Sequence, residues 1–176
     1  MDLKDYIRSI KDYPKKGILF RDITTLIKDE LAFEATINQI VEKSKKFKVD
    51  KIAAIESRGF VFASAVSYIL KKPFIMLRKK NKLPADVHSV DFELEYGTAT
   101  IEVHKDSISE NDSVLIIDDL IATGGTAEAA AKLVEISKGN IAAFIFVINL
   151  FDLGGYDNLL KKGYKVENLM DFPGHW

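Results

Sequence analysis

The stretch that decides the fold covers residues 114–126 and reads Val-Leu-Ile-Ile-Asp-Asp-Leu-Ile-Ala-Thr-Gly-Gly-Thr. Its first four residues, Val114–Ile117, form a continuous apolar run, which is typical of a strand buried on both faces. A segment with helical patterning follows at about residues 126–138. A buried strand, a short polar loop and a helix together form the repeating unit of a parallel sheet covered by helices.

The same alternation extends along the chain and predicts a doubly wound α/β fold with a mostly parallel sheet and flanking helices. Residues 81–105 differ, because polar and apolar residues alternate about Gly97; this predicts a hairpin-like insertion of antiparallel strands or a mobile loop. Gly139 is expected to end the preceding helix in a left-handed conformation. The remaining segments predict strands at residues 52–55, 74–77 and 141–148, and helices at residues 4–10, 30–47 and 60–70.

Length and composition limit the possible classes of protein. The chain has 176 residues, of which 47% are hydrophobic and 29% charged, and its formal net charge is −1. This is enough for one domain over residues 1–176 with a substantial core. The near-neutral charge argues against a general nucleic-acid binder. Because there are no cysteines, disulfides, thiolate zinc sites and cysteine nucleophiles are excluded. No signal peptide and no apolar run of about 18 residues is visible, so we expect a cytoplasmic protein without a membrane partner.

The polar part of the opening stretch combines two kinds of chemistry. Asp118 and Asp119 are adjacent carboxylates that repel each other and need cationic or hydroxyl partners, such as a ribose diol or a nearby divalent cation. Gly124 and Gly125 allow a tight turn at the start of a helix, where backbone N–H groups and the helix dipole favour a phosphate. Taken separately, these features are also typical of turns and helix caps. In this order they match a ribose 5-phosphate in size and polarity.

These residues are similar to the phosphoribosyl pyrophosphate signature of the type I phosphoribosyltransferases. Four other segments resemble the branch of that family that uses adenine, and they occur in the family's order and spacing from about residue 14 to residue 155. The four segments are Gly17–Ile23, Glu56–Phe60, Arg78–Pro84 and Leu94–Gly97.

The resemblance implies a purine salvage enzyme that joins adenine to phosphoribosyl pyrophosphate and releases AMP and pyrophosphate. It further implies a small N-terminal hood, a flexible catalytic loop, Mg²⁺ as cofactor and a homodimer. Losing pyrophosphate leaves a cation-like ribose and a highly charged leaving group, so the enzyme must neutralise that group, hold the base in line and exclude water.

The resemblance also assigns residues to the phosphoribosyl pyrophosphate site. Arg58 is expected to meet the pyrophosphate, and the basic segment that follows the second strand approaches it partly across the dimer interface. No protein side chain is expected to be a dedicated metal ligand; Mg²⁺ binds through the substrate, with Asp118 or Asp119 as the candidate protein contact. The expected site residues are Arg58, Arg78, Lys79, Lys82, Asp118, Asp119, Ala122, Thr123, Gly124, Gly125 and Thr126.

For the base, the resemblance implies that Phe20 stacks on adenine and that the backbone of Leu19 and Arg21 reads its edge. Leu150 closes the other face; plain core packing is the alternative for Phe20 and Leu150. Glu95 is expected to act as general acid or base on a ring nitrogen, with Tyr96 helping to close the site, although a surface strand with an alternating polar face explains the same pattern. The chain departs from the family pattern at Ala85, Asp86, Val87 and Phe92. This departure affects what the resemblance implies about the motion and hydrogen bonds of the loop, but not what it implies about the reaction.

Two other functions fit parts of the pattern. The first is a phosphoribosyltransferase for another base, such as hypoxanthine, xanthine or orotate, because the phosphoribosyl signature does not distinguish among them. The second is a non-catalytic sensor of phosphoribosyl pyrophosphate. Such a sensor usually carries an extra recognition domain, for which 176 residues leave no room.

Overall fold

The computed structural model describes residues 1–94 and 97–175, and at its centre lies a seven-stranded sheet with the order β5-β6-β4-β3-β7-β8-β9. Strands β4, β3, β7, β8 and β9 run parallel, whereas β6 pairs antiparallel with both β4 and β5. The strands are β3 (Lys51–Ile55), β4 (Phe74–Lys79), β5 (Val87–Glu93), β6 (Thr98–His104), β7 (Ser113–Ile121), β8 (Asn140–Leu150) and β9 (Val166–Phe172).

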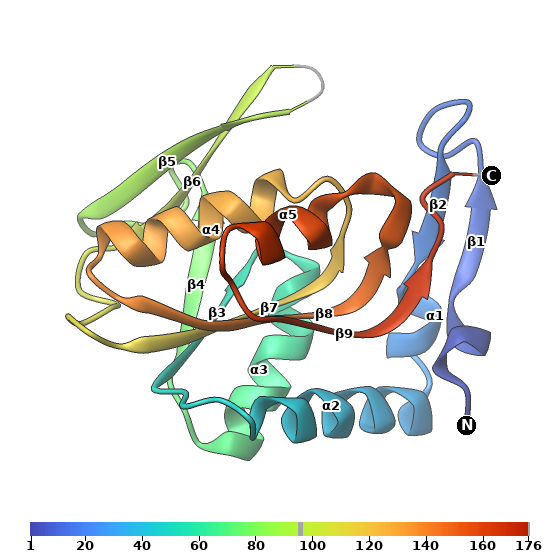
Figure 1. The fold of residues 1–176 in the computed structure, drawn as a ribbon, viewed down its shortest axis with the longest axis horizontal. Helices are drawn as coiled ribbons and strands as arrows, with labels where there is room; N and C mark the ends of the chain where they lie inside the picture. Colours follow the sequence, from blue (N-terminus) through green and yellow to red (C-terminus); the bar gives the residue numbers. More distant parts are fainter. Residues whose placement is uncertain (95–96, 176) are drawn as a thin grey trace.

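Helices cover both faces of the sheet, as the sequence predicts (Figure 1). Helices α2 (Glu30–Ser44) and α3 (Arg58–Leu70) lie on one face, and α4 (Gly125–Ile136) and α5 (Gly155–Lys161) lie on the other. Each face has its own apolar core, with Phe62 fully buried in the first and Phe144 in the second. The apolar runs of β3, β7 and β8 therefore have the physical reason expected for them, since they are buried on both sides, whereas β4 leaves Met76 exposed.

The N-terminal segment forms a small hood beside the sheet. A short 3₁₀ helix, η1 (Leu3–Tyr6), precedes the strand β1 (Arg8–Lys11), which pairs antiparallel with β2 (Leu19–Asp22), and α1 (Thr24–Ile27) follows. The expected helix at residues 4–10 is therefore wrong. Its helical spacing is overridden because pairing with β2 satisfies the backbone groups of β1 across the chain.

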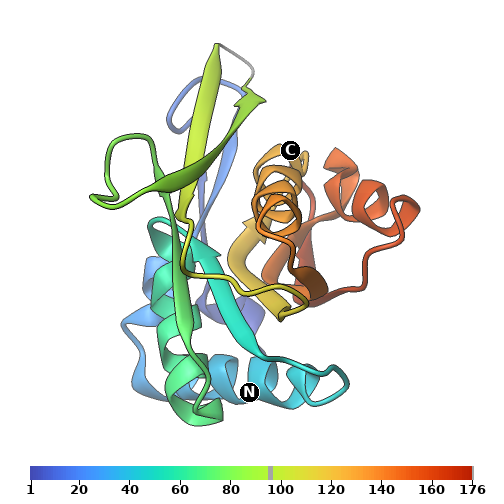
Figure 2. The same cartoon turned by 90° about the vertical axis from the view of Figure 1, so that its left-hand side faces the viewer.

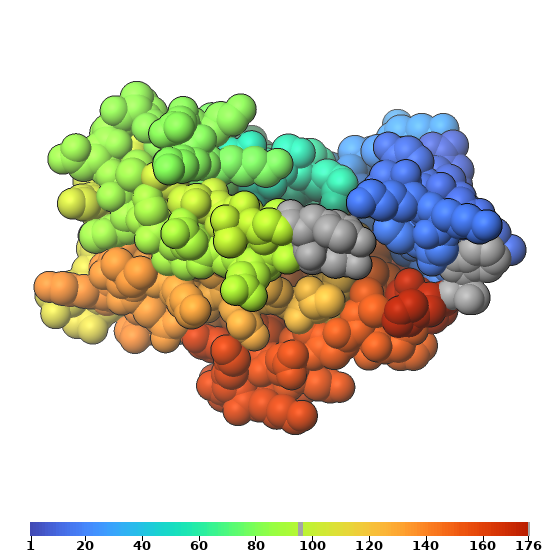
Figure 3. Space-filling view, turned by 90° about the horizontal axis from the view of Figure 1, so that it is seen from above, coloured from blue at the N-terminus to red at the C-terminus, as the bar shows by residue number. Residues whose placement is uncertain are grey.

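The insertion at residues 81–105 is an antiparallel hairpin, which confirms one of the two expected forms. Strands β5 and β6 pair from Val87 opposite His104 to Glu93 opposite Thr98. Figure 2 shows this hairpin rising from the edge of the sheet, and Figure 3 shows it from above, alongside α4 and facing the hood at the other end of the molecule. The hairpin and the hood thus lie on the same side of the sheet as the loop after β7.

Two details of the central unit differ from expectation. Strand β7 extends to Ile121, where it still pairs with Asn149 of β8, so Asp118 and Asp119 lie inside the strand and not after it. The left-handed residue after α4 is Lys138, with φ 69°, and not Gly139. Gly139 is needed for space, because a Cβ there would lie 2.9 Å from Cγ2 of Ile108.

Helices of the described residues are all too short or too polar to cross a membrane.

Candidate functional site

The largest concentration of predicted residues lies where the order of the parallel strands reverses. Strand β3 has β4 on one side and β7 on the other, so the loops after β3 and β7 leave the sheet in opposite directions and open a crevice between them. A cavity of about 460 Å³ occupies this place. It is lined by the predicted residues Arg58, Lys79, Asp118, Asp119, Ala122, Thr123, Gly124, Gly125 and Thr126, together with Phe92 and Leu94 of the hairpin.

Asp118 and Asp119 share the cavity wall but differ in their partners. The Asp119 side chain is only 6% exposed, and its Oδ2 accepts a hydrogen bond from Nε of Arg58 at 2.5 Å. Burial raises the pKa of Asp118 well above its usual range, and the neighbouring charge of Asp119 raises it further. The expected cationic partner of the acidic pair is therefore present, and it is Arg58.

Arg58 is held at the first turn of α3, immediately after the loop that follows β3. Burial acts to lower the pKa of Arg58, but the charge and hydrogen bond of Asp119 outweigh it and raise that pKa. Gly59 lets α3 approach β7 this closely, since a Cβ at this position would lie 2.9 Å from Oδ1 of Asp118. The half-exposed guanidinium group thus borders the cavity while remaining paired on one side.

The loop after β7 turns at Gly124, whose φ of 92° suits glycine, and α4 begins at the next residue. The twelve-residue helix directs its N-terminal N–H groups and the positive end of its dipole toward the cavity. This arrangement can hold the phosphate of a sugar phosphate, as the sequence predicts.

Gly155, at the start of α5, is a supporting residue that the sequence reasoning missed. Its N–H donates a hydrogen bond to the carbonyl oxygen of Ala122 at 3.0 Å, and a Cβ there would lie 2.5 Å from that oxygen and 2.7 Å from N of Gly124. The backbone of α5 therefore packs directly against the phosphate loop. The only indication of this contact in the sequence is the pair of adjacent glycines, Gly154 and Gly155, that follows a long strand.

The basic segment is only partly at the cavity. Lys79 lines it, whereas Arg78 and the exposed Lys82 lie outside its lining. Glu56, to which the sequence assigns no role, positions this segment: its Oε1 accepts hydrogen bonds from Nε of Arg78 at 3.2 Å and from N of Lys79 at 2.8 Å. Burial acts to raise the pKa of Glu56, but these two contacts outweigh it and lower that pKa.

The residues expected to bind the base form a separate group next to the hood. Leu19, Phe20 and Arg21 lie on β2, and Phe20 packs edge-on against Tyr13 with ring centroids 5.1 Å apart. Leu150 ends β8 and is buried in the core beneath the sheet, which fits the packing alternative. All four lie outside the lining of the 460 Å³ cavity, so the structure does not bring them into one described pocket with the acidic pair. The other two expected residues, Glu95 and Tyr96, lie outside the described residues.

Asp22, at the end of β2, is a second residue that the sequence reasoning quoted without a role. It is buried, and it accepts hydrogen bonds from the hydroxyl of Thr24 at 2.6 Å and from Nη2 of Arg8 at 2.5 Å. The Thr24 hydrogen bond, followed by that of Arg8, lowers the pKa of Asp22 to about 2. The charge of Asp22 also raises the pKa of Arg58, but it contributes less than the charge and hydrogen bond of Asp119.

The donor set of the cavity can accept magnesium together with a phosphorylated substrate. Mg²⁺ prefers oxygen ligands and is usually held by one or two carboxylates plus substrate phosphates. Asp118 and Asp119 supply such carboxylates, while the described residues contain no cluster of three acidic or histidine side chains that would hold the ion alone. The residues therefore fit an ion that arrives with its substrate.

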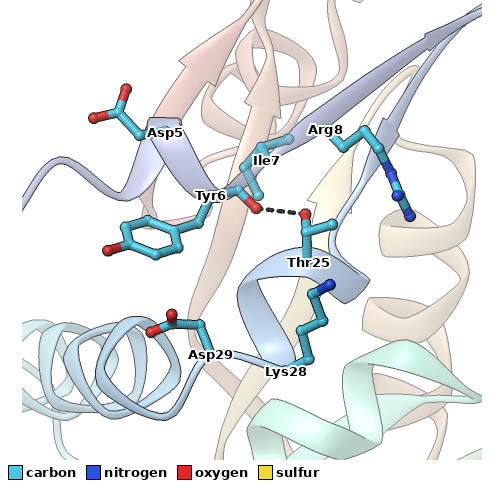
Figure 4. Close-up of a pocket in the computed structure, with 7 residues that line it drawn as sticks. All are labelled: Asp5, Tyr6, Ile7, Arg8, Thr25, Lys28 and Asp29. Carbon is cyan, nitrogen blue, oxygen red and sulfur yellow. Dashed lines mark hydrogen bonds between the residues drawn. The ribbon is translucent and has the colours of Figure 1, made fainter.

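A second cavity, of about 370 Å³, lies between η1, β1 and α1 (Figure 4). Its polar groups make contacts within the protein. The Thr25 hydroxyl donates to the carbonyl oxygen of Tyr6 at 2.5 Å, Arg8 pairs with Asp22, and Asp29 accepts from N of Ala32 at the start of α2. These contacts join η1, β1, β2 and α1 to one another and cap the start of α2.

Comparison with known proteins agrees with this site. A profile of the phosphoribosyl transferase domain matches residues 24–169. The chain is 85% identical over 175 residues to an adenine phosphoribosyltransferase of Pelagibacter ubique, covering 99% of this chain and 100% of that one. Among solved structures, it is similar to the adenine phosphoribosyltransferase of Thermoanaerobacter pseudethanolicus, with a TM-score of 0.93, 45% identity and coverage of 97% and 98% of the two chains.

The fold is also similar to that of the Giardia lamblia enzyme complexed with 9-deazaadenine, with a TM-score of 0.91, 33% identity and 98% of each chain covered. These likenesses extend over the hood, the sheet and the hairpin as well as the phosphate loop. The family expected from the sequence is thereby confirmed: the chain belongs to the phosphoribosyltransferases, in the branch of the adenine phosphoribosyltransferases.

Proposed function

We propose that this chain transfers the 5-phosphoribosyl group from phosphoribosyl pyrophosphate to adenine, which gives AMP and pyrophosphate. The observation that carries the proposal is the cavity between the loops after β3 and β7. There the carboxylates of Asp118 and Asp119 and the N-terminus of α4, which suits a phosphate, face the same space. The adenine branch of the family supplies the base. In the reaction the C1′–O bond breaks with its electron pair on pyrophosphate, a bond forms between C1′ and N9 of adenine, and N9 loses its proton.

The residues of the cavity bind the sugar phosphate. The 5-phosphate occupies the turn formed by Thr123, Gly124, Gly125 and Thr126, where the N–H groups at the start of α4 point. The ribose hydroxyls donate hydrogen bonds to the carboxylates of Asp118 and Asp119. These neutral donors offset the repulsion between the two carboxylates. Ala122 contributes backbone to the same loop.

Cationic side chains neutralise the leaving pyrophosphate. Arg58 borders the cavity from the β3 loop, and its planar guanidinium group suits phosphate oxygens. Lys79 borders the cavity from β4, and Arg78 and Lys82 extend the positive charge along the same segment. When bound with the substrate, Mg²⁺ supplies further positive charge to the pyrophosphate oxygens, next to Asp118 and Asp119.

The hood binds the base. Phe20 offers an aromatic face for adenine, and the backbone of Leu19 and Arg21 offers hydrogen bonds to its polar edge. Leu150, which is buried at the end of β8, is assigned to the opposite face of the base. The Giardia structure with 9-deazaadenine supports a purine-sized ligand in this branch of the family. Glu95 accepts or donates the proton at the ring nitrogen, and Tyr96 helps to exclude water.

We further propose that the chain works as a homodimer in the cytoplasm, where both substrates are metabolites. Exposed apolar side chains on α3 and β4 support a self-association surface, with Tyr68 86% and Met76 46% exposed. Met76 and Arg78 are two residues apart on β4 and point to the same face, so a partner that covers Met76 also approaches Arg78. A dimer in sedimentation is the expected result, and a fully active monomer would remove the role of Arg78 across an interface.

The decisive experiment is a steady-state assay with phosphoribosyl pyrophosphate, Mg²⁺ and each of adenine, hypoxanthine, xanthine and orotate, with identification of the product. Adenine is expected to be strongly preferred; preference for another base would reassign the enzyme within the family. Glu95→Gln is expected to lower turnover more than binding of phosphoribosyl pyrophosphate. The double variant Asp118→Asn/Asp119→Asn is expected to lose that binding, and binding without any turnover in the unaltered protein would favour a sensor.

A further inference from the structure

The last residues of the chain contact two segments that lie far apart in the sequence. Figure 1 shows the C-terminus beside β1 and β2 of the hood. There Nη2 of Arg21 donates a hydrogen bond to the carbonyl oxygen of Pro173 at 2.9 Å, and the guanidinium carbon of Arg21 lies 4.6 Å from the centre of the Phe172 ring. Residues 172–175, called the tail below, therefore cover the side chain of Arg21, whose backbone is assigned to the polar edge of adenine.

The same tail is fastened to the loop after β8. The N–H of Gly174 donates to Oδ1 of Asp152 at 2.5 Å, and Nδ1 of His175 lies 3.0 Å from Oδ2 of the same carboxylate. Asp152 is two residues beyond Leu150, which is assigned to the other side of the base. One carboxylate thus ties residues 172–175 to the strand end that carries Leu150.

The fit of the tail against this loop depends on a glycine. A Cβ at Gly174 would lie 2.6 Å from Cγ of Leu153 and 2.9 Å from Oδ1 of Asp152. The conformation of Gly174 does not require glycine through a positive φ, so the requirement is one of space. In this position the tail forms both the Asp152 hydrogen bond and the Pro173–Arg21 hydrogen bond.

Arg21 is held from both sides in that position. Its Nη1 donates to the hydroxyl of Ser9 on β1 at 2.6 Å, while its Nη2 reaches the tail. Burial lowers the pKa of Arg21 and the charge of Asp152 opposes that shift, so the guanidinium group and the anchoring carboxylate interact electrostatically as well. A hydrogen-bonded chain thereby runs from β1 through Arg21 and the tail to the end of β8.

We propose that residues 172–175 fasten the two sides of the adenine site to each other, with Asp152 and Gly174 as positioning residues for the base. The proposal rests on the proposed function. A two-stranded hood is a small element with little core of its own, and such elements need tertiary contacts to hold one position. The tail supplies these contacts on the side where adenine binds, whereas the phosphoribosyl pyrophosphate cavity lies outside its reach.

The test compares the KM for adenine with the KM for phosphoribosyl pyrophosphate. Asp152→Ala removes the acceptor of Gly174 and is expected to raise the KM for adenine about tenfold, with the KM for phosphoribosyl pyrophosphate and kcat changed less than about twofold. Asp152→Asn retains an acceptor oxygen and is expected to restore most of the adenine affinity. Gly174→Ala displaces the tail without removing any polar side chain, and the same selective increase is expected.

Asp112→Ala is the matched control. Asp112 also accepts a backbone hydrogen bond, from Ser109 at 2.7 Å, and pairs with Lys51 at 2.7 Å, but it lies at the amino end of the interior strand β7, away from the tail. Asp112→Ala is expected to lower the free energy of unfolding without raising the KM for adenine more than the KM for phosphoribosyl pyrophosphate. The positioning role would be overturned if Asp152→Ala and Gly174→Ala changed the KM for adenine and the KM for phosphoribosyl pyrophosphate equally. It would also be overturned if neither variant changed either KM. An unaltered protein that does not use adenine would overturn the proposed function itself, and this is measured first.

Discussion

Nε of Arg58 lies 2.5 Å from Oδ2 of Asp119, across the crevice between the loops after β3 and β7. The two residues are 61 positions apart in the chain: Arg58 begins α3, just after β3, and Asp119 lies in β7, the neighbour of β3 in the sheet. Arg58 is assigned to the pyrophosphate and Asp119 to the ribose. The ion pair therefore holds both side chains at the same cavity, so the position of each depends on the other.

Removing Arg58 leaves a buried carboxylate without its cation. We expect Arg58→Ala to lower the free energy of unfolding by roughly 1–2 kcal/mol, a discounted value because half of the arginine is exposed, and to abolish measurable turnover. The double variant Arg58→Ala/Asp119→Asn removes the unpaired charge, so it is expected to recover the stability but not the turnover. Urea unfolding combined with the steady-state assay measures both, and additive losses of stability in the double variant would show that the pair is not coupled.

Replacing Asp118 by a neutral residue is expected to raise the stability of the protein while weakening ligand binding, whereas removing Arg58 lowers both stability and turnover. Because its folded pKa is raised, the ionised form opposes folding, and stability is lost as the pH rises above the ordinary carboxyl pKa. In metal-free buffer at pH 8, we expect Asp118→Asn to raise the free energy of unfolding by about 1 kcal/mol, with a smaller gain at pH 4. The amide oxygen still accepts the hydrogen bond from N of Asp119.

The same variant is expected to bind AMP at least about tenfold more weakly by calorimetry, since a neutral amide binds the ribose hydroxyls less strongly than a carboxylate does. A stability gain of the same size at pH 4 and pH 8 would contradict the electrostatic explanation. Lower stability at pH 8 would show that the carboxylate makes a contact that the structure does not reveal.

The sequence predicts the parallel strands β3, β4, β7 and β8, because a continuous apolar run needs no distant partner to be recognised, but it does not predict β9, whose residues are mostly half-buried and partly polar. Residues 52–55 and 141–148 illustrate this, since each lies within the strand that the structure shows. The hood was predicted less well. Its β1 strand is short and mostly exposed, so only pairing with β2 distinguishes it from a helix.

A similar division applies to the site. Residues of the phosphate loop are contiguous in the sequence, and their order alone indicates their chemistry. Supporting residues act through tertiary contacts: Gly155 meets the loop from 33 positions after Ala122, and Glu56 reaches Arg78 from another strand. Such contacts depend on how the elements pack. A single sequence therefore predicts candidate binding residues but not the residues that position them.

Gly155 provides a direct test of this support. A methyl group there would collide with backbone atoms of Ala122 and Gly124, which cannot move without shifting the phosphate loop. We expect Gly155→Ala to lower the free energy of unfolding by about 1–3 kcal/mol and to weaken AMP binding by at least about tenfold. Thermal unfolding and calorimetry measure the two effects.

Gly139→Ala is the control for that variant. It also creates a close contact, 2.9 Å from Cγ2 of Ile108, but at the end of α4 that is remote from the loop. A comparable loss of stability with unchanged AMP affinity is expected. If Gly139→Ala weakens AMP binding as much as Gly155→Ala does, then the effect comes from general loosening of the domain and not from the loop.

Acid unfolding should report on Asp22, which joins β1, β2 and α1 within the hood. Its folded pKa of about 2 lies below the ordinary aspartate value, so its contribution to stability is complete above pH 4 and is lost as the pH falls toward 2. We expect Asp22→Asn to be less stable than the unaltered protein by about 1–2 kcal/mol at pH 7, with the difference shrinking below pH 4. Urea unfolding at pH 7, 4 and 2.5 measures this change, with the exposed Asp106→Asn as the control. A difference that stays constant down to pH 2.5 would mean that the Arg8 and Thr24 contacts do not depend on the charge of Asp22, and that the amide loses only packing.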